Sequence, residues 1–261
     1  MWDGSSWSDV GGGITSAIIE PGGGQIPGQA AAVDLSGDTQ GQAVFETSVA
    51  VPVGRSGQSF GGHLDALAEL LDDVRAFTRD PRSFDQNRSR PLAGSRRDLE
   101  ALGPVLEGEI PLILGADRAA HIEALIRFQE AQDLRLVLRG GAEAWRHADA
   151  LAAAKIPVIL DPVVYGPGSW DAREARPDNA AILAAAGVDV LFFIRHHSSH
   201  FARKLAQTGG NAVRGGLPHA AAMRALTAAP AEIFRLESRG RIEAGALANL
   251  VLWSGDPLEL S

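Results

Sequence analysis

Short, continuous apolar segments recur along the chain, and stretches with apolar residues at helical spacing separate most of them. Apolar runs that do not alternate with polar residues are typical of strands buried on both faces of a parallel sheet, which helices connect. Strands are expected at 14–19, 43–53, 110–114, 134–138, 156–160 and 188–194. Helices are expected at 64–77, 98–106, 118–132, 142–154, 179–186 and 219–226. This order predicts an α/β fold, either an open doubly wound sheet or a (β/α)8 barrel, and both place chemistry at the carboxyl ends of the strands.

The charge and the cysteine count narrow the classes of partner and site. The 261 residues include 24 Lys and Arg against 32 Asp and Glu, a formal net charge of -8, which does not favour a nucleic-acid partner. The chain has no cysteine, so a metal site would need His and carboxylate ligands. No window approaches the roughly 20 apolar residues of a membrane span.

The end of the chain differs in character from the rest. Two turn-flanked apolar segments, 240–245 and 249–253, predict a pair of strands outside the α/β repeat. We therefore expect residues 1–236 to form the barrel and residues 237–261 to form a short C-terminal β appendage.

This C-terminal segment, followed by Gly255-Asp256-Pro257-Leu258, resembles the closing strands of the amidohydrolase superfamily, particularly its imidazolonepropionase-like subgroup. Residues 217–234 resemble the last barrel helices of that family. Residues 13–16 together with 21–24, and residues 140–145, resemble one subgroup of it. The resemblance implies an incomplete TIM-like barrel that lacks its first strand, with the appendage as the remnant of a β-sandwich. It also implies hydrolysis of amide, cyclic amide or peptide-like C–N bonds by water activated on a divalent metal, with zinc the first choice.

The ligand positions that the resemblance implies are not filled as expected. No two of the seven histidines are separated by one residue, so the His-x-His pair of the family is absent. Gly115 stands where the family has a histidine after its fifth strand, and Arg139 stands where the family has one after its sixth strand. Residues 195–199 follow the expected eighth strand, where the family has an aspartate, and they contain no carboxylate. Two explanations stay open: the chain is a fragment of a longer hydrolase from a subgroup that has also drifted, or it is a complete but degenerate descendant. We expect a cytoplasmic protein in the second case and an exported one if the chain belongs to a longer precursor.

A histidine cluster follows the last expected strand, close to a carboxylate at the end of the strand before it. Asp161 and His196 are the candidate catalytic residues, and His197, His200 and Asp161 are the candidate metal ligands. The alternative is an exposed polar loop with a helix-capping serine.

Further candidates lie at other strand ends. Arg139, Glu143 and Arg195 are candidate substrate-binding residues. Residues 57–61 match the G-x-S-x-G pattern of serine hydrolases, but the segment is separated from its strand, so Ser59 is better explained as a helix N-cap.

The expected function is that of an amidohydrolase-like protein with impaired catalysis, because the metal ligands of the family are missing. One alternative is a non-catalytic binding or scaffold protein on the same fold, and a weaker one is a serine hydrolase that uses Ser59. An active chain would take a small amide or peptide-like substrate. A second copy of the chain or an N-terminal segment is expected to cover the open barrel edge.

Overall fold

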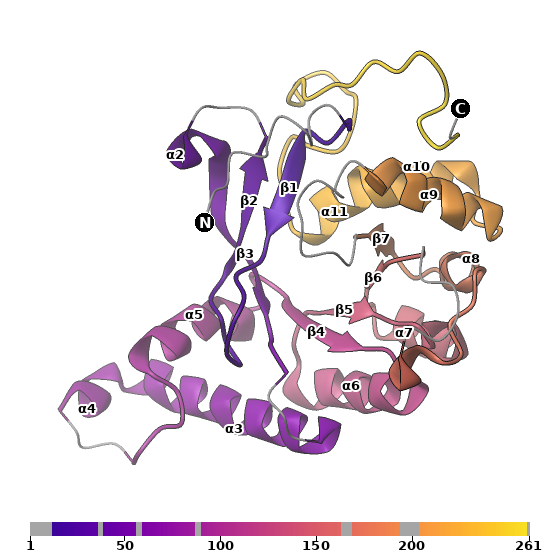
Figure 1. Ribbon diagram of the computed structural model, residues 1–261. Helices are drawn as coiled ribbons and strands as arrows, with labels where there is room; N and C mark the ends of the chain where they lie inside the picture. Colours follow the sequence, from indigo (N-terminus) through magenta and orange to yellow (C-terminus); the bar gives the residue numbers. More distant parts are fainter. Residues whose placement is uncertain are drawn as a thin grey trace.

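The computed structural model describes residues 12–35, 39–55, 59–86, 90–162, 169–193 and 204–259. Seven strands form one sheet in sequence order. They are β1 (Ser16–Ile19), β2 (Ala30–Asp34), β3 (Val44–Pro52), β4 (Leu112–Ala116), β5 (Leu136–Gly140), β6 (Val158–Leu160) and β7 (Val190–Phe192). The sheet is curled, and with its helices it forms the incomplete TIM-like barrel that the sequence predicts (Figure 1).

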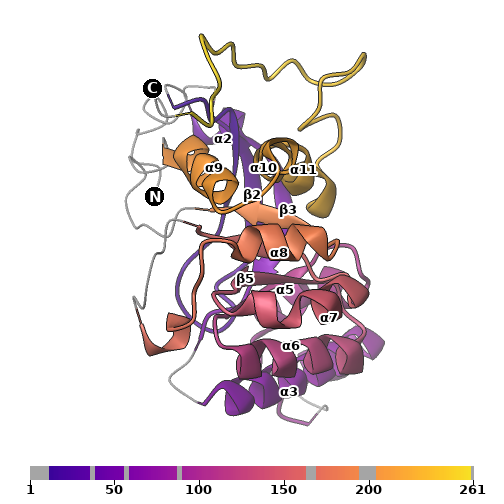
Figure 2. The ribbon, with the colours of Figure 1, turned by 90° about the vertical axis from the view of Figure 1, so that its right-hand side faces the viewer.

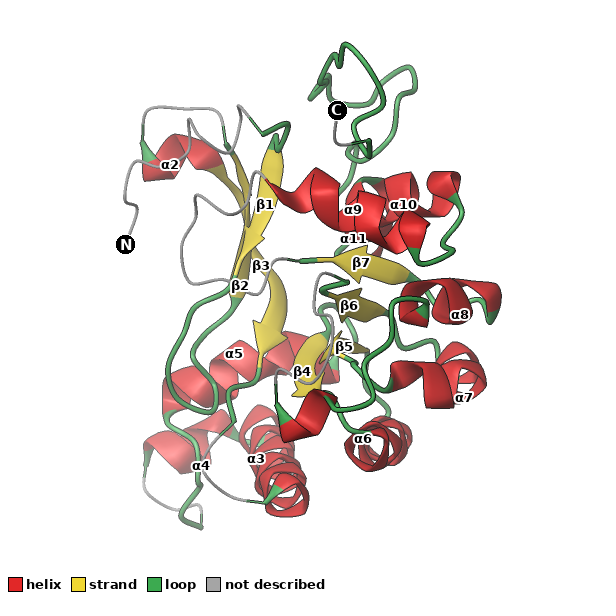
Figure 3. Cartoon of the chain, turned by 45° about the vertical axis from the view of Figure 1, so that its right-hand side comes forward, coloured by secondary structure: helices red, strands yellow, loops and turns green. Residues whose placement is uncertain are grey.

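Helices follow most of the strands, and most of them cover the convex side of the sheet. The α-helices are α2 (Gln40–Ala43), α3 (Phe60–Arg79), α4 (Pro81–Asp85), α5 (Arg96–Leu106), α6 (Ala119–Gln132), α7 (Ala148–Ala153), α8 (Asn179–Ala185), α9 (Leu205–Arg214), α10 (His219–Leu226) and α11 (Ala228–Ile233). Two 3-10 helices, η1 (Ala144–His147) and η2 (Trp170–Ala172), complete the description. In Figure 3 the helices α3, α6, α7 and α8 follow the sheet in an arc, and Figure 2 shows them stacked one above another. Within the described residues, no helix is both long enough and apolar enough to cross a membrane.

The buried side chains of β4 to β7 alternate between two cores. Leu112, Leu136, Val158 and Val190 belong to a large core shared with the outer helices. The residues that follow them in each strand belong to a second core, on the concave side of the sheet: Ile113, Val137, Ile159 and Leu191. Helix α11 and strands β2 and β3 fill the rest of this inner core. Because successive side chains of a strand point to opposite faces, the alternation fixes which residues face the interior.

The first two strands differ from the expectation. Residues 14–19 were expected to be a parallel barrel strand, but β1 pairs with β2 in antiparallel register, and β2 is antiparallel to β3. The connections between these strands contain no long helix, whereas a parallel pair needs a crossover of a dozen or more residues. The parallel part of the sheet therefore runs from β3 to β7.

The two strands expected in the C-terminal segment are absent from the described residues 204–259. The backbone there forms local hydrogen bonds instead of strand pairs. The N–H of Leu247 donates to the carbonyl of Ser238, and that of Ala246 donates to the carbonyl of Glu243. Gly240 and Gly245 have φ values of 74° and 91°, which favour turns over extended chain. The division between a barrel and an appendage at residue 236 stays a prediction.

Among the described residues, β1 and β7 are the edge strands of the sheet. Unpaired strand edges are available to a partner. The expectation that a second copy or an N-terminal segment covers an edge stays a prediction.

Candidate active site at the concave mouth

Six strands end at the same side of the half-barrel. Strand β1 runs in the direction of β3 because β2 is antiparallel to both, and β3 to β7 are parallel. In parallel barrels the carboxyl ends of the strands carry the chemistry. Glu20 directly follows β1, Arg139 is the fourth residue of β5, and Asp161 directly follows β6. This end is called the concave mouth below.

An ion pair crosses the concave interior at this mouth. Nη1 of Arg139 donates to Oε2 of Glu20. Strands β1 and β5 are separated by β2, β3 and β4 in the sheet, so the two side chains meet only because the sheet curls and both project inward. The Arg139 side chain is 31% exposed and that of Glu20 is 24% exposed. The pair is therefore anchored inside the curl while its outer edge stays accessible.

The register of the strands agrees with this inward orientation. Arg139 lies two residues beyond Val137, which packs in the inner core. Gly115 pairs with Arg139 across the β4–β5 ladder and lies two residues beyond Ile113, which also packs in the inner core. The two positions are therefore neighbours on the concave face.

The backbone at Gly115 leaves space beside the guanidinium. A Cβ atom placed on Gly115 would meet one atom within 4 Å, the carbonyl oxygen of Arg139 at 3.9 Å. Among the described residues, the bond to Glu20 is the one hydrogen bond of the Arg139 side chain. A guanidinium has five N–H donors. The remaining donors of Arg139 are thus available to a molecule that enters beside Gly115.

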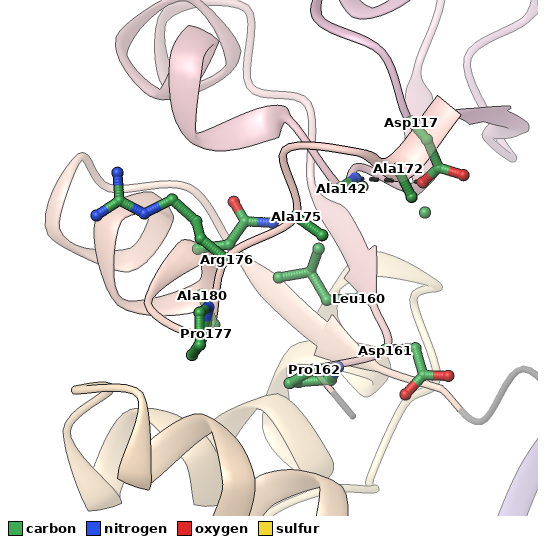
Figure 4. Close-up of a pocket in the computed structure, with 12 residues that line it drawn as sticks. Asp117, Ala142, Leu160, Asp161, Pro162, Ala172, Ala175, Arg176, Pro177 and Ala180 are labelled. Atoms are coloured by element: carbon green, nitrogen blue, oxygen red, sulfur yellow. Dashed lines mark hydrogen bonds between the residues drawn. The ribbon is translucent and has the colours of Figure 1, made fainter. Parts of the chain in front are cut away.

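A small cavity lies behind the mouth, between the ends of β4 to β6 and the start of α8. Its volume is about 50 Å³, and Asp117 and Asp161 are among its lining residues (Figure 4). Both carboxylates lie on the same side of the cavity, and the Arg176 side chain points away from them. Oδ1 of Asp117 accepts the backbone N–H of Ala142 at 3.2 Å. The cavity has room for one or two water molecules rather than for a substrate.

Asn179, at the start of α8, also lines this cavity and is 7% exposed. Its Nδ2 donates to the carbonyl of Gly141 at 2.8 Å, which ties α8 to the end of β5. Oδ1 of Asn179 has no hydrogen-bond partner among the described residues.

Glu143 is buried and binds backbone. Its Oε2 accepts the N–H of Ala119 at 2.8 Å, at the first residue of α6. A carboxylate there satisfies a free N–H group and interacts favourably with the helix dipole. This contact anchors α6; the predicted role of Glu143 in substrate binding stays a prediction.

The rim of the mouth carries two guanidinium groups around one carboxylate. Nε of Arg118 lies 2.6 Å from Oδ1 of Asp171, and Nη1 of Arg55 lies 3.7 Å from Oδ2. The ring of His121 stacks on Phe60, with 4.3 Å between the centroids. Burial lowers the pKa of His121, and the two nearby cations add to this effect while Asp171 opposes it. The neutral form of His121 is therefore favoured.

Part of the predicted site lies outside the described residues: Arg195, His196, His197 and His200. Ser59 is the N-cap of α3, and its Oγ accepts the N–H of Gly62 at 3.1 Å, as expected of a capping residue. The structure thus brings Arg139 and Asp161 to one mouth and adds Glu20. Sequence reasoning missed Glu20, although its place directly after a predicted strand was a usable signal.

The predicted metal site is described only in part, because His197 and His200 lie outside the described residues. No group of three or more His, Asp or Glu side chains that could hold an ion occurs within the described ranges. A glycine and an ion-paired arginine occupy the two neighbouring inward positions of β4 and β5, and neither side chain can donate an electron pair to a metal.

Comparisons with known proteins support one family. Residues 171–260, about the last third of the chain, match the model of the amidohydrolase family. A comparison with curated proteins found no match. Among solved structures, the chain is similar to a crystal structure of an amidohydrolase from Thermotoga maritima MSB8. The TM-score is 0.86 at 24% sequence identity, over 98% of this chain and 70% of that one. The chain therefore has the fold of that amidohydrolase, as the resemblance implied.

Proposed function

We propose that this chain is a member of the amidohydrolase family, of its imidazolonepropionase-like subgroup, that binds a small amide, cyclic amide or peptide-like molecule at the concave mouth. The observation that carries the proposal is the Arg139–Glu20 pair, which lies at the carboxyl ends of the strands, where barrels of this fold carry their chemistry. The family match of residues 171–260 supports the reaction class, hydrolysis of a C–N bond.

The side chains suggest a division of roles. Arg139 would donate to the carbonyl oxygen of the bound amide and stabilise the negative charge that develops there during attack by water. Asp161 would accept the proton of that water, with His196 as the second proton-transfer group on the evidence of the sequence. Glu143 would hold α6 in place.

Hydrolysis by this chain is proposed to be slow. Metal-activated water is the chemistry that the family resemblance implies, and the described residues contain no group of three or more potential metal ligands. The guanidinium of Arg139 would supply part of the stabilisation that a metal gives to the negative charge on the amide oxygen. It would not lower the pKa of a water molecule as a bound metal does.

The test is an assay of the purified full chain against a panel of amides, cyclic amides and dipeptides, with product formation followed by mass spectrometry. We expect slow hydrolysis that falls at least tenfold in Asp161→Asn. Asp65→Asn, a change at an exposed position of α3, serves as the matched control and should leave the rate unchanged.

One alternative uses the same mouth. A non-catalytic binding protein on this fold is favoured by the accessible Arg139–Glu20 pair in the absence of a described ligand set. Binding without turnover would select it over the hydrolase. A panel in which no compound binds and none is hydrolysed would contradict both. The serine hydrolase alternative would require a fluorophosphonate probe to label Ser59, and its capping role argues against that outcome.

A further inference from the structure

The C-terminal segment 242–253 carries most of the exposed apolar surface of the described residues. Six of the eight large apolar side chains that are exposed in the described ranges lie in it: Ile242, Leu247, Leu250, Val251, Leu252 and Trp253. Together these residues expose on the order of 700 Å², more than the few hundred Å² of a typical apolar patch on a monomer. In Figures 1 and 2 the segment, drawn in yellow, extends away from the helices that precede it. Such a surface is typical of an interaction site.

Residues 249–253 are arranged as a strand that lacks a partner. Leu250 and Leu252 are 61% and 100% exposed, whereas Val251 and Trp253 are 42% and 43% exposed. Side chains that alternate in this way are typical of extended backbone. Within the part of the chain that the structure describes, the backbone groups of residues 250–253 form no hydrogen bond. Their N–H and C=O groups are therefore available to a second strand.

Two contacts hold residues 249–253 against the start of β1. Nδ2 of Asn249 donates to Oγ of Ser16 at 3.2 Å. The ring of Trp253 lies over Gly13, where a Cβ atom would overlap the ring. Both contacts are at the amino end of β1, whereas the concave mouth is at its carboxyl end. The apolar surface of the segment is therefore separate from the candidate active site.

The composition of the segment favours a second copy of the same chain as its partner. Residues 244–255 contain no charged side chain. When two such strands pair antiparallel about a twofold axis at Val251, Leu250 of one copy lies opposite Leu252 of the other, and no like charges face each other. A standard interface buries about 800 Å² on each partner, so two copies of this surface supply about the area that a stable dimer needs. A charged partner would find no opposite charge there.

We propose that residues 249–253 pair with the same residues of a second copy, so that the chain forms a symmetric dimer through its C-terminal segment. The pairing satisfies the backbone groups of residues 250–253 and removes Leu250 and Leu252 from water. Because the twofold axis passes through Val251, the two copies of this residue face each other directly.

Sedimentation velocity of the full chain, at concentrations from about 1 to 100 µM, measures the dimer. We expect a dimer that Leu252→Lys weakens at least tenfold, because the lysine would lie opposite an apolar side chain in the pair. Leu252 is fully exposed, so the change should leave the circular dichroism spectrum and the thermal melting of the chain unaffected. Trp170→Lys, at an exposed apolar residue outside the segment, is the matched control and should keep the dimer. A chain that stays monomeric at every concentration, or a dimer that Leu252→Lys leaves intact, would overturn the proposal.

A cysteine at the twofold axis tests the register of the pair. The chain has no cysteine of its own, so a single introduced thiol can form a protein disulfide only between two copies. Directly opposite residues of an antiparallel pair have Cα atoms about 4.5–5.5 Å apart, which is within the range of a disulfide. Val251→Cys should therefore form a disulfide-linked dimer at least tenfold faster than Ala244→Cys, which lies seven residues from the axis. Equal rates in the two variants would contradict the pairing at Val251.

Discussion

Arg239 binds Asp34 through both of its terminal nitrogens, at 2.7 and 3.0 Å, and so joins the C-terminal segment to β2. The same carboxylate accepts the Ser16 hydroxyl at 2.7 Å and the Asn249 side-chain amide at 3.1 Å. The Arg239 guanidinium also lies 3.5 Å from the centre of the Phe45 ring. Although the segment forms no strand, it is fastened to the first two strands at this point.

Arg239→Met should lower the free energy of unfolding by about 2 kcal/mol, because it leaves a largely buried Asp34 carboxylate without its charged partner. Chemical denaturation measures the change. Arg241→Met is the control: its pair with Glu243 is exposed, and its loss should cost less than about 0.5 kcal/mol. Equal effects of the two changes would show that the Arg239 contact does not hold the segment.

Substitution by alanine should affect the free energy of unfolding differently at Gly115 and at Gly141, two glycines near the mouth. Gly115→Ala should change the free energy of unfolding by less than about 0.5 kcal/mol, since a methyl group meets open space there. Gly141 has a φ of 65°, and a Cβ would lie 3.0 Å from Cγ1 of Val158, so Gly141→Ala should cost about 1–3 kcal/mol.

Gly115→Ala also separates an effect on stability from an effect on ligand binding. Gly115→Ala narrows the space beside Arg139 and should weaken binding of a small amide at the mouth, while thermal melting stays close to that of the parent chain. Unchanged amide binding in Gly115→Ala would show that ligands do not use this space.

The burial of His63 predicts how the free energy of unfolding depends on pH. Its side chain is 1% exposed, and burial lowers its pKa from 6.5, with a smaller effect in the same direction from Arg55. The unfolded chain therefore binds a proton more readily than the fold does, so the free energy of unfolding should decrease as the pH falls below about 6.5 and level off below the pKa of the folded state.

Denaturation at several pH values measures this dependence, and the NMR titration of the His63 ring gives its pKa directly. The decrease between pH 7 and the folded pKa should be smaller in His63→Phe. A ring that titrates at or above 6.5 in the folded chain would contradict the burial argument.

Much of the fold could be predicted because the strands of the parallel part are continuous apolar runs. The expected segments 110–114, 134–138 and 156–160 each overlap a strand, and the helix expected at 219–226 coincides with α10. Strand β2 was missed because it begins with three alanines, which have a low strand propensity.

The C-terminal segment shows the limit of pattern reasoning. Its apolar spacing suggests strands, yet Ile242 is 89% exposed and Leu252 is fully exposed. A strand needs a partner ladder as well as a pattern, and a pattern alone does not reveal whether that partner is present.

The candidate site was predicted in part for a similar reason. Arg139 and Asp161 could be found because they end predicted strands, which is a local property of the sequence. The partner of Arg139 could not be found in this way, since Glu20 is 119 residues away and reaches it only through the curl of the sheet. The position of Glu20 also depends on the antiparallel pairing of β1 with β2, which the sequence pattern does not predict.

The most direct measurement is a double-mutant cycle on Glu20 and Arg139, with Glu20→Gln, Arg139→Met and the double variant compared by chemical denaturation. Because the two side chains meet across the concave interior, the account predicts a coupling free energy of about 1–2 kcal/mol. Strictly additive effects would show that the two side chains do not stabilise each other, and would contradict the site built on this pair.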